Sequence, residues 1–475
     1  MLHQPRIKLF NLSNSRDRIA QDLFESVGEL PLICPHGHVS PQLFSTENEK
    51  FDNPAELFVT ADHYVLRMLL SQGVRCQDLG IQGVSDESYI SAPEQIWQIF
   101  CDHYPLFDGT PTGLWIENIL AMVFGIMKKP DSENAIELYQ QIAQSLRSAS
   151  FNLRKLFQKF NIEVLCTTDD VTDSLNVHQE ISQAGWQGRI LPTLRMDRVV
   201  DIQHPTWPDH IQALSSLTNQ EIVDYRSFIW AIEKRRTDYQ ALGCKASDLS
   251  LKTPYTCQLS NQKSEEFFQL GLKKQITDDE ALQFKGQLIL ELARMSAEDG
   301  MVMQLRAGIY RNHSPGIFQE LGPDMGFDIP VKVEWTQNLK PLLDAYGMDT
   351  NLRLILFTLD ESNYARELAP IAGAYPAIKL GPPWWFNDSP QGIRRYFDSV
   401  METAGFENTV GFNDDARNFL SIPARHDLWR RISALWLADL VQNGQLSGSD
   451  ARKRMADLAY GLAKSGYRLD QTQYS

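Results

Sequence analysis

Two histidines separated by one residue, His36 and His38, are the first side chains in the chain that could hold a metal ion. They follow the short apolar run 30–34, which is typical of a buried strand. Side chains alternate across a strand, so residues two apart point the same way. Two such imidazoles and a carboxylate from elsewhere suit a metal site with open positions. A turn that happens to contain two histidines is the alternative, because the motif is short.

The strands that must position such residues recur along the chain. Eight short apolar runs, each ending in polar residues, are predicted as strands: 30–34, 162–166, 189–194, 243–246, 301–305, 354–359, 377–380 and 409–412. Helical segments lie between them, and strands that alternate with helices predict an α/β fold, here a closed (β/α)8 TIM-type barrel. In that fold the carboxyl ends of the strands form one face. The polar residues after the eight runs are therefore expected to meet in one pocket.

Helix signals support this order. The segment 278–299 carries a capping box at Thr277 and Glu280 and a glycine stop at Gly300. Amphipathic spacing predicts two further helices over 428–442 and 450–464. Two long intervals also have helical character, and loops of that length without structure are uncommon. We therefore expect a single barrel domain over 1–475 with helical insertions at 39–160 and 196–242.

Composition narrows the function classes. The 475 residues carry a formal net charge of -15 with no basic stripe, which argues against a nucleic-acid partner. No apolar run reaches membrane-spanning length and no signal peptide is recognised, so a cytoplasmic protein without a membrane partner is expected. Six scattered cysteines without a Cys-x-x-Cys motif predict reduced thiols. The sequence leaves open whether chains associate into a homo-oligomer.

With these residues placed, the chain resembles the uronate isomerase family of the amidohydrolase superfamily, in order and over nearly the whole length. The segments that carry the resemblance are 36–38, 62–64, 167–175, 243–248, 321–328, 384–388, 415–417, 425–426 and 430–431. Four positions depart from the usual family residues: Cys34, Gly37, Leu249 and Arg306. Many members have histidine at the last two. The family converts D-glucuronate to D-fructuronate and D-galacturonate to D-tagaturonate. The resemblance implies the same aldose–ketose isomerisation and a small-molecule uronate substrate here.

The resemblance also implies a metal held by His36, His38 and Asp415. Two imidazoles and a carboxylate suit one divalent ion, with zinc expected first and manganese or iron as alternatives. Lys245 could bridge two metals as a carbamate, but a structural or substrate role is favoured and one metal at most is predicted. For Asp415 the alternative is a loop aspartate paired with Arg417.

The remaining site residues follow from the chemistry of the isomerisation. The candidate catalytic residues are Asp415, Tyr64 and Arg417, and the candidate substrate-binding residues are Arg195, Arg306, Arg311, Trp384, Trp385 and His63. Arg306 is an additional cation specific to this sequence. Arginine suits a clamp on the C6 carboxylate because its planar fork binds a carboxylate at two points. Each arginine alone could instead be a surface or ion-pair residue. The tryptophans could stack on the sugar or simply fill the core.

Two role assignments stay open at this stage. A tyrosine whose pKa is lowered by a neighbouring arginine could carry the C2 proton, with Asp415 taking a hydroxyl proton during ring opening; the two roles could also be exchanged. Asp169 and Asp170 could be catalytic, although paired carboxylates at a strand end often cap a helix.

Two other functions remain alternatives to the isomerase. The first is a metal-dependent hydrolase or lyase acting on another acidic substrate on the same barrel, which would need a strongly activated metal-bound water. The second is a non-catalytic relative that binds a sugar acid. Retention of both histidines together with Asp415 and Arg417 weakens this second alternative.

Overall fold

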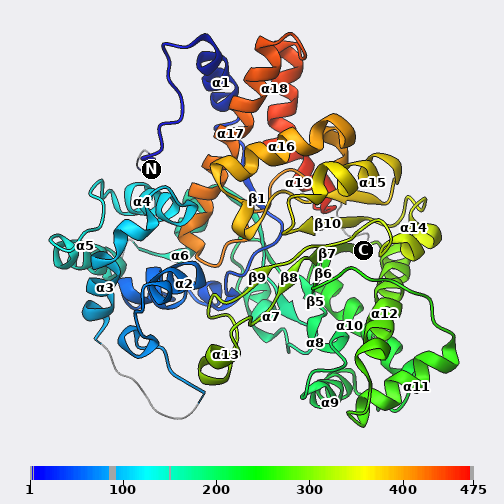
Figure 1. The fold of residues 1–475 in the computed structure, drawn as a ribbon. Helices are drawn as coiled ribbons and strands as arrows, with labels where there is room; N and C mark the ends of the chain where they lie inside the picture. Colours follow the sequence, from blue (N-terminus) through cyan, green and yellow to red (C-terminus); the bar gives the residue numbers. More distant parts are fainter. Residues whose placement is uncertain (1–2, 4, 85–91, 149–150, 471–475) are drawn as a thin grey trace.

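Parallel strands curl into one barrel at the centre of the computed structural model, which describes residues 3, 5–84, 92–148 and 151–470 (Figure 1). The strands form two hydrogen-bonded sheets, in the orders β1-β2-β4 and β11-β10-β7-β6-β5-β3. β2 (Ile162–Cys166) is continued by β3 (Asp169–Asp170), and β4 (Ile190–Leu191) by β5 (Leu194–Arg195). Backbone hydrogen bonds from Leu165 N to Arg189 O, Thr167 N to Leu191 O and Asp169 N to Thr193 O run unbroken between them. The two sheets are therefore one curved surface, as the predicted (β/α)8 barrel requires.

The ring closes where the first and last strands meet. The first strand is β1 (Leu32–Cys34). The remaining strands of the ring not yet introduced are β6 (Ala246–Leu251), β7 (Val302–Ala307), β10 (Leu354–Thr358) and β11 (Ile378–Leu380). The eighth predicted strand is short: Thr409 forms a single parallel bridge to Leu380, and Val410 N donates to Leu380 O at 3.0 Å. His38 N donates to Ala416 O at 2.8 Å and joins the last segment to the first.

Two strands lie further along the chain than predicted. The fourth strand was predicted over 243–246 but runs over Ala246–Leu251, so Ser247 and Asp248 lie inside it. The fifth extends two residues beyond its predicted end and contains Arg306. Both errors have one cause, because polar side chains inside a barrel strand interrupt the apolar pattern by which a strand is recognised. Elsewhere β7 and β10 are buried along their whole length, as expected for parallel strands covered on both faces.

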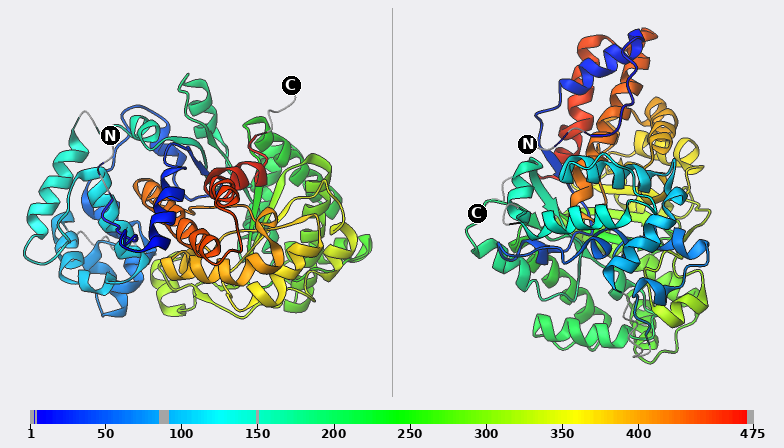
Figure 2. Two further views of the ribbon diagram at one scale, coloured as in Figure 1. Left: turned by 90° about the horizontal axis from the view of Figure 1, so that it is seen from above. Right: turned by 90° about the vertical axis from the view of Figure 1, so that its left-hand side faces the viewer.

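Helices cover the outside of the barrel (Figures 1 and 2). α12 (Asp278–Asp299) is the one predicted most closely: Thr277 and Glu280 form the capping box, and Gly300 ends the helix at φ 76°. α17 begins earlier than predicted. The segment predicted as one helix over 450–464 is helical throughout, with a π-helical turn at Asp457–Gly461 between α18 and α19. The outer helices are α7 (Asn176–Gln183), α11 (Asn261–Leu272), α14 (Lys340–Tyr346), α15 (Ala369–Ala374), α16 (Pro390–Ala404), α17 (Ile422–Gln442), α18 (Gly448–Ala456) and α19 (Leu462–Gly466).

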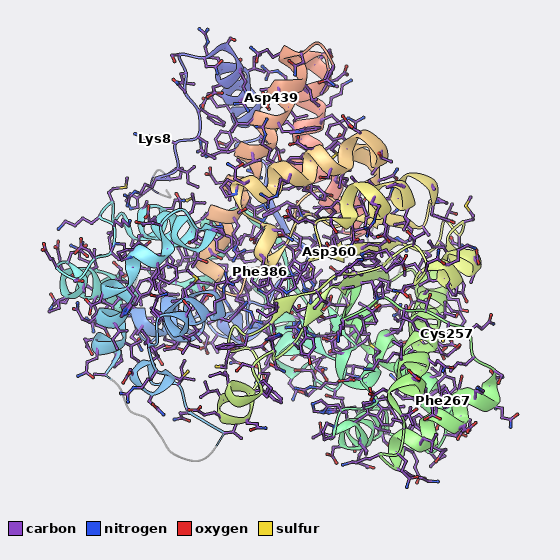
Figure 3. The ribbon with its side chains drawn as sticks, viewed as in Figure 1. Lys8, Cys257, Phe267, Asp360, Phe386 and Asp439 are labelled. Carbon is purple, nitrogen blue, oxygen red and sulfur yellow. The ribbon has the colours of Figure 1, made fainter. Side chains whose placement is uncertain are left out.

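The interval between β1 and β2 is helical and lies beside the barrel (Figure 2). Its helices are α2 (His63–Ser71), α3 (Pro93–Asp102), α4 (Pro111–Phe124), α5 (Ala135–Arg147) and α6 (Leu153–Lys159); residues 85–91 and 149–150 lie outside the described part of the chain. This helical region contacts the barrel at Phe386, which is labelled near the centre of Figure 3. The guanidinium of Arg67, on α2, lies 4.9 Å from the centroid of the Phe386 ring. This region therefore forms one wall above the strand ends.

The interval 196–242 contains α8 (Asp197–Val200), α9 (Trp207–Thr218) and α10 (Tyr225–Ala241). After β7 the chain forms a small hairpin from β8 (Ile309–Tyr310) and β9 (Ile329–Pro330), which enclose α13 (Pro315–Leu321). α1 (Ser15–Glu25) packs along α17 away from the strand ends, where Asp439 accepts from Arg16 and Arg394 (Figure 3). No helix among the described residues has the length and apolar character to cross a bilayer.

Candidate active site

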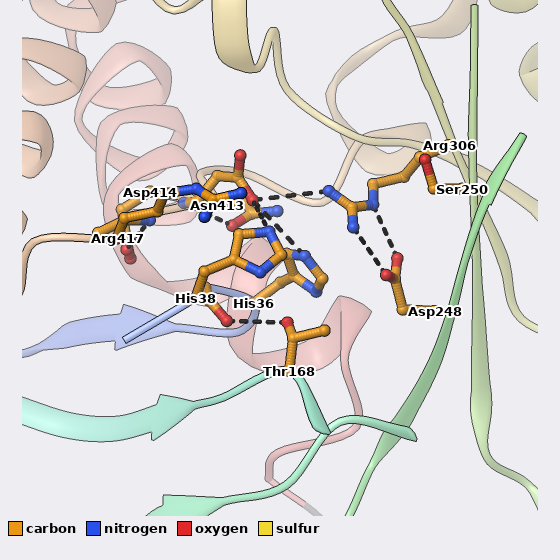
Figure 4. Close-up of polar contacts among 12 residues, drawn as sticks. His36, His38, Thr168, Asp248, Ser250, Arg306, Asn413, Asp414 and Arg417 are labelled. Atoms are coloured by element: carbon orange, nitrogen blue, oxygen red, sulfur yellow. Dashed lines mark hydrogen bonds and ion pairs between the residues drawn. The ribbon is translucent and has the colours of Figure 1, made fainter. Parts of the chain in front are cut away.

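His36, His38 and Asp415 converge at the junction of the first and last barrel segments. The two histidines are labelled in Figure 4. The Nε2 atoms of His36 and His38 lie 3.5 and 3.3 Å from Asp415 Oδ1. The two imidazole rings stand nearly perpendicular, with centroids 5.3 Å apart. Gly37 makes this junction tight, since a Cβ there would lie 3.3 Å from Ala416 O. Asp415 itself adopts a left-handed backbone conformation, with φ 45°, which is sparsely populated and occurs preferentially at functional sites.

This donor set fits one divalent metal. Buried polar atoms almost always have a partner, yet His36 Nε2 and Asp415 Oδ1 have no hydrogen bond in the protein. Burial and the charge of Arg306 lower the pKa of His36 to about 3, which keeps its imidazole neutral. Burial also lowers the pKa of His38. Burial alone would raise the pKa of Asp415, but the close contact with His38 and the charge of Arg306 hold it well below its usual range. Neutral imidazoles and an ionised carboxylate are the forms that bind metal ions.

Gln304 on β7 fixes the orientation of His36. Its amide nitrogen lies 3.3 Å from His36 Nδ1, and its amide oxygen accepts from Tyr467 at 2.9 Å. The two ends of an amide are assigned from such contacts and can be exchanged without moving the group. With the oxygen towards His36, Nδ1 donates and the Nε2 lone pair faces Asp415. A ring nitrogen held in this way is what metal-ligating histidines usually show.

A second group of potential ligands, Cys34, Asp414 and His426, lies next to the first. Its members bond to each other: His426 Nε2 lies 3.2 Å from Asp414 Oδ2 and 3.8 Å from Cys34 Sγ. Burial, with the charge of Asp414, raises the pKa of the Cys34 thiol well above its usual range. A protonated thiol and a histidine already bonded to a carboxylate indicate a structural network rather than a second metal site.

Arg306 fills the middle of the barrel beside the candidate metal ligands (Figure 4). Its Nε and Nη2 donate to the two carboxylate oxygens of Asp248 at 2.8 and 2.7 Å, and its Nη1 lies 3.6 Å from Asp415 Oδ1. The guanidinium also lies over Trp384, 5.5 Å from the ring centroid. Asp248 was not among the predicted site residues. Its signal was the polar pair Ser247-Asp248, which was placed after a strand instead of within one.

A cavity of about 30 Å³ lies in front of these groups. Every predicted site residue except His36 lines it, and so does one residue that was not predicted, Asp324; the lining residues are His38, His63, Tyr64, Arg195, Arg306, Arg311, Asp324, Trp384, Trp385, Asp415 and Arg417. Residues from the first, third, fifth, seventh and eighth strand ends therefore meet there. The helical region contributes His63 and Tyr64, from the first turn of α2.

The arginines of this cavity differ in how firmly they are held. Arg195 pairs with Asp197, with Nη2–Oδ2 2.6 Å, and this charge raises the pKa of the guanidinium. Arg311 donates to Asp328 at 2.8 Å and to Ser250 at 3.1 Å. Arg417 forms a long ion pair, 3.7 Å, with the half-exposed Asp324.

Tyr64 lies buried against His63, with the rings stacked 4.3 Å apart. A neighbouring arginine was expected to lower its pKa, and this expectation was wrong. Burial, with the charge of Asp388, raises the pKa of Tyr64 well above its usual range, and Arg425 opposes this only in part. At neutral pH Tyr64 is therefore a neutral phenol that can donate a proton.

Trp384 and Trp385 form the opposite wall of the cavity. Arg311 lies over Trp385, 5.2 Å from the ring centroid. Trp385 has φ 60°, a conformation in which a bulky residue is an outlier, and this turn brings both indoles to the cavity. Their Nε1 atoms are buried without a hydrogen bond in the protein. Donors left unbonded at a cavity wall suit a polar ligand.

Two other carboxylates mentioned in the sequence analysis lie outside the cavity. Asp169 accepts from Thr167 at 2.6 Å, and the same hydroxyl lies 2.9 Å from His178. Asp170 accepts from Thr172 and shapes the turn after the strand. Lys245 precedes β6 at its amino end, away from the catalytic face, with Arg189 and Asp470 among its charged neighbours. These contacts favour structural roles for all three.

Comparison with known proteins links this chain to one family. A family model described as Glucuronate isomerase matches residues 8–467. A protein of Nostoc punctiforme named uronate isomerase is 47% identical over 453 residues, which cover 95% of this chain and 96% of that protein. A glucuronate isomerase from Caulobacter crescentus has a crystal structure that superposes with a TM-score of 0.95 at 39% identity, covering 99% of this chain and 98% of that one. A uronate isomerase structure from Thermotoga maritima gives 0.89 at 26% identity, with coverages of 95% and 97%.

Proposed function

The chain belongs to the glucuronate isomerase family of aldose–ketose isomerases, and we propose that its cavity binds a hexuronate such as D-glucuronate or D-galacturonate and moves a proton between C2 and C1. The observation that carries this proposal is the single cavity lined by four arginines, Tyr64, His38 and Asp415. An acidic sugar needs cations for its carboxylate, a proton donor and acceptor for its carbons, and groups that hold its hydroxyls. The cavity offers all of these within one small volume.

We propose Arg311 and Arg417 as the clamp on the C6 carboxylate. Their guanidinium groups face each other closely enough for one oxygen of Asp324 to lie 3.8 and 3.7 Å from them. A carboxylate held by two guanidinium groups is fixed in position as well as in charge. Trp385, beneath Arg311, supplies the apolar side on which the C–H face of the sugar can rest.

Elsewhere along the cavity, the charges of Arg306 and Arg195 both act on Asp248, and Arg306 Nη1 lies 3.6 Å from Asp415 Oδ1. They would stabilise the negative charge that develops on O1 or O2 as the C2 proton leaves, because fixed cations in a buried site need no reorganisation at that moment. Arg306 cannot turn away, since Asp248 holds it at two points.

For the proton transfer itself, the ionised Asp415 accepts the C2 proton and the neutral phenol of Tyr64 donates a proton to C1. The O2 hydroxyl proton passes to O1, and Asp415 then returns its proton to the Tyr64 oxygen. Of the two assignments left open by the sequence, this is the one in which Asp415, and not Tyr64, is the base. The raised pKa of Tyr64 supports it, because a phenol that holds its proton is poorly suited to take another group's proton. Both side chains line the same cavity.

His36, His38 and Asp415 would hold one divalent metal, and zinc suits two imidazoles and a carboxylate best, with manganese or iron as alternatives. Such an ion would supply a Lewis acid that orients the hydroxyls of the substrate. Six unpaired cysteines, five of them buried, support a reducing compartment, and we place the protein in the cytoplasm.

Incubation with D-glucuronate or D-galacturonate in heavy water tests the proposed function. Loss of the C2 proton signal by NMR together with appearance of the ketose supports it. Binding without exchange would indicate a sugar-acid-binding protein, and neither binding nor exchange would indicate another substrate. Arg417→Met should abolish turnover, whereas Arg452→Met, exposed on α18 and outside the cavity, serves as a charge-matched control.

A further inference from the structure

We infer that Asp324 is a built-in carboxylate that occupies the arginine clamp and is displaced by the carboxylate of the substrate, so that it sets the affinity of the site. This inference rests on the proposed function, because it takes the ligand to be a sugar acid. The position of Asp324 was not anticipated from the sequence, and its role is distinct from that of the metal-ligand group and of the proton carriers.

Asp324 is bound only weakly by the two arginines, so a substrate carboxylate can compete with it for them. One oxygen, Oδ1, lies 3.8 Å from Arg311 Nη1 and 3.7 Å from Arg417 Nη2. Both distances exceed those of a charge-assisted hydrogen bond, about 2.7–2.9 Å. The side chain is 51% exposed, so water screens the two attractions. A ligand carboxylate that enters between the guanidinium groups at normal distances would replace Asp324.

A second aspartate on the same segment shows the contrast. Asp328 is 5% exposed and accepts from Arg311 at 2.8 Å. Its other oxygen accepts from Asn312 N at 2.8 Å and ties the two ends of the hairpin together. Asp328 therefore holds Arg311 in place whether or not Asp324 is present. Among the described residues, Asp324 is the carboxylate that pairs with Arg417.

The backbone around Asp324 forms a tight turn. Gly322, Asp324 and Gly326 all have left-handed φ values, 82°, 66° and 84°, within five residues. Gly326 lies directly against α2, where a Cβ would come within 2.5 Å of Arg67 and 2.8 Å of His63 O. The segment is thus closely packed at Gly326 and exposed at Asp324, so the side chain of Asp324 is the less constrained of the two.

The volumes on either side of this segment support displacement. The catalytic cavity measures about 30 Å³, whereas pockets for small ligands measure about 300–1,000 Å³. A cleft of about 900 Å³ lies on the other side, and Pro323 and Arg311 line it. Residues 323 and 324 therefore separate the two spaces. When Asp324 leaves the arginines, the cavity joins this cleft and gains room for a hexuronate.

Two aspartates in contact with one arginine allow a matched test. Asp324→Asn removes the competing charge and should lower KM for D-glucuronate about three- to tenfold, with kcat changed less, since each exposed ion pair contributes little. Asp328→Asn removes the same charge but releases Arg311, and should raise KM. Both variants lose one negative charge, so bulk electrostatics are equal.

An unchanged or higher KM in Asp324→Asn would overturn the inference, because Asp324 would then be neutral towards the substrate or would assist its binding. Asp324→Ser repeats the measurement with a second side chain in case the asparagine variant folds poorly. Turnover by the wild-type protein tests the proposed function separately. If turnover is absent, the same ratio between variants is read from calorimetric binding of D-glucuronate.

Discussion

Arg306 and Asp248 form a two-point ion pair in the interior of the barrel, with N–O distances of 2.8 and 2.7 Å and side chains 3% and 0% exposed. Ser250, two residues after Asp248, is the register partner of Arg306 on the neighbouring strand β6. The pair thus joins two adjacent strands directly below the substrate cavity. Its charges are fully desolvated, so each is stable there only because the other is present.

Removal of one partner should therefore be costly. Arg306→Met leaves Asp248 as a buried carboxylate without its partner and should lower the free energy of unfolding by about 3–5 kcal/mol. The double variant Arg306→Met with Asp248→Leu should recover much of this loss, because no buried charge remains. Urea unfolding of the single and double variants measures both effects. A single variant as stable as the wild type, or a double variant that loses the sum of the two single losses, would contradict this account.

Metal content should report on the histidine–aspartate group. We expect one divalent ion per chain by elemental analysis, and loss of that ion in His36→Ala and His38→Ala, because each removes one of three ligands. His63→Ala is the control, since His63 lines the same cavity but is not in the ligand group. Two ions per chain, or equal metal content in the His36 variant and the control, would argue against the site.

Replacement of Tyr64 separates the two proton-transfer steps. If Asp415 accepts the C2 proton and Tyr64 donates to C1, Tyr64→Phe should form ketose at least about 100-fold more slowly, in the range expected for loss of a general acid. It should still exchange the C2 proton with heavy water. NMR of D-glucuronate in the presence of the variant measures exchange and ketose formation together. Loss of exchange along with ketose would instead make Tyr64 the base.

The stability of the folded chain should depend on pH through Asp169. Burial raises the pKa of this carboxyl from 3.8 to about 7, so the folded chain keeps a proton that the unfolded chain releases near pH 4. This contribution to stability is present below pH 4 and is lost as the pH rises towards 7. In the variant Asp169→Asn the side chain cannot ionise. The stability advantage of this variant over the wild type should therefore grow by about 2–3 kcal/mol between pH 5 and pH 8.

Unfolding at the two pH values measures this difference. A variant that differs from the wild type by the same amount at pH 5 and pH 8 would show that Asp169 is ionised throughout.

The barrel could be predicted because most of its strands are apolar runs with polar ends, and because helix caps such as Thr277 and Glu280 are local signals. The prediction failed where side chains inside the barrel are charged. Asp248 and Arg306 neutralise each other across β6 and β7, and a partner 58 residues away leaves no trace in the local pattern. The amphipathic pattern of α17 was recognised only from residue 428 for a similar reason. Arg425 is buried against Asp388 and Trp115, so a charged residue stands where the pattern requires an apolar one.

The site residues named from the sequence lie around one cavity, apart from His36 behind it, because most lie at or near strand ends and strand ends converge in a barrel. His63 and Tyr64 reach the cavity from α2. The sequence could not predict the protonation states of these residues or the carboxylates that pair with them. The raised pKa of Tyr64 depends on Asp388 and on burial by distant segments, and Asp324 reaches the arginines only through the turn at Gly322 and Gly326. Contacts of this kind arise from packing between elements and have no local sequence signature.

The hydrogen bond from His38 N to Ala416 O, which closes the barrel, also determines when the site can exist during synthesis. The ribosome delivers the chain from its amino end, so both histidines emerge long before Asp415. Until then a nascent chain has only two of the three ligands and no closed ring to orient them. The newly made protein should therefore acquire its metal only near the end of translation, and fragments that stop short of residue 415 should neither retain the ion nor turn over substrate.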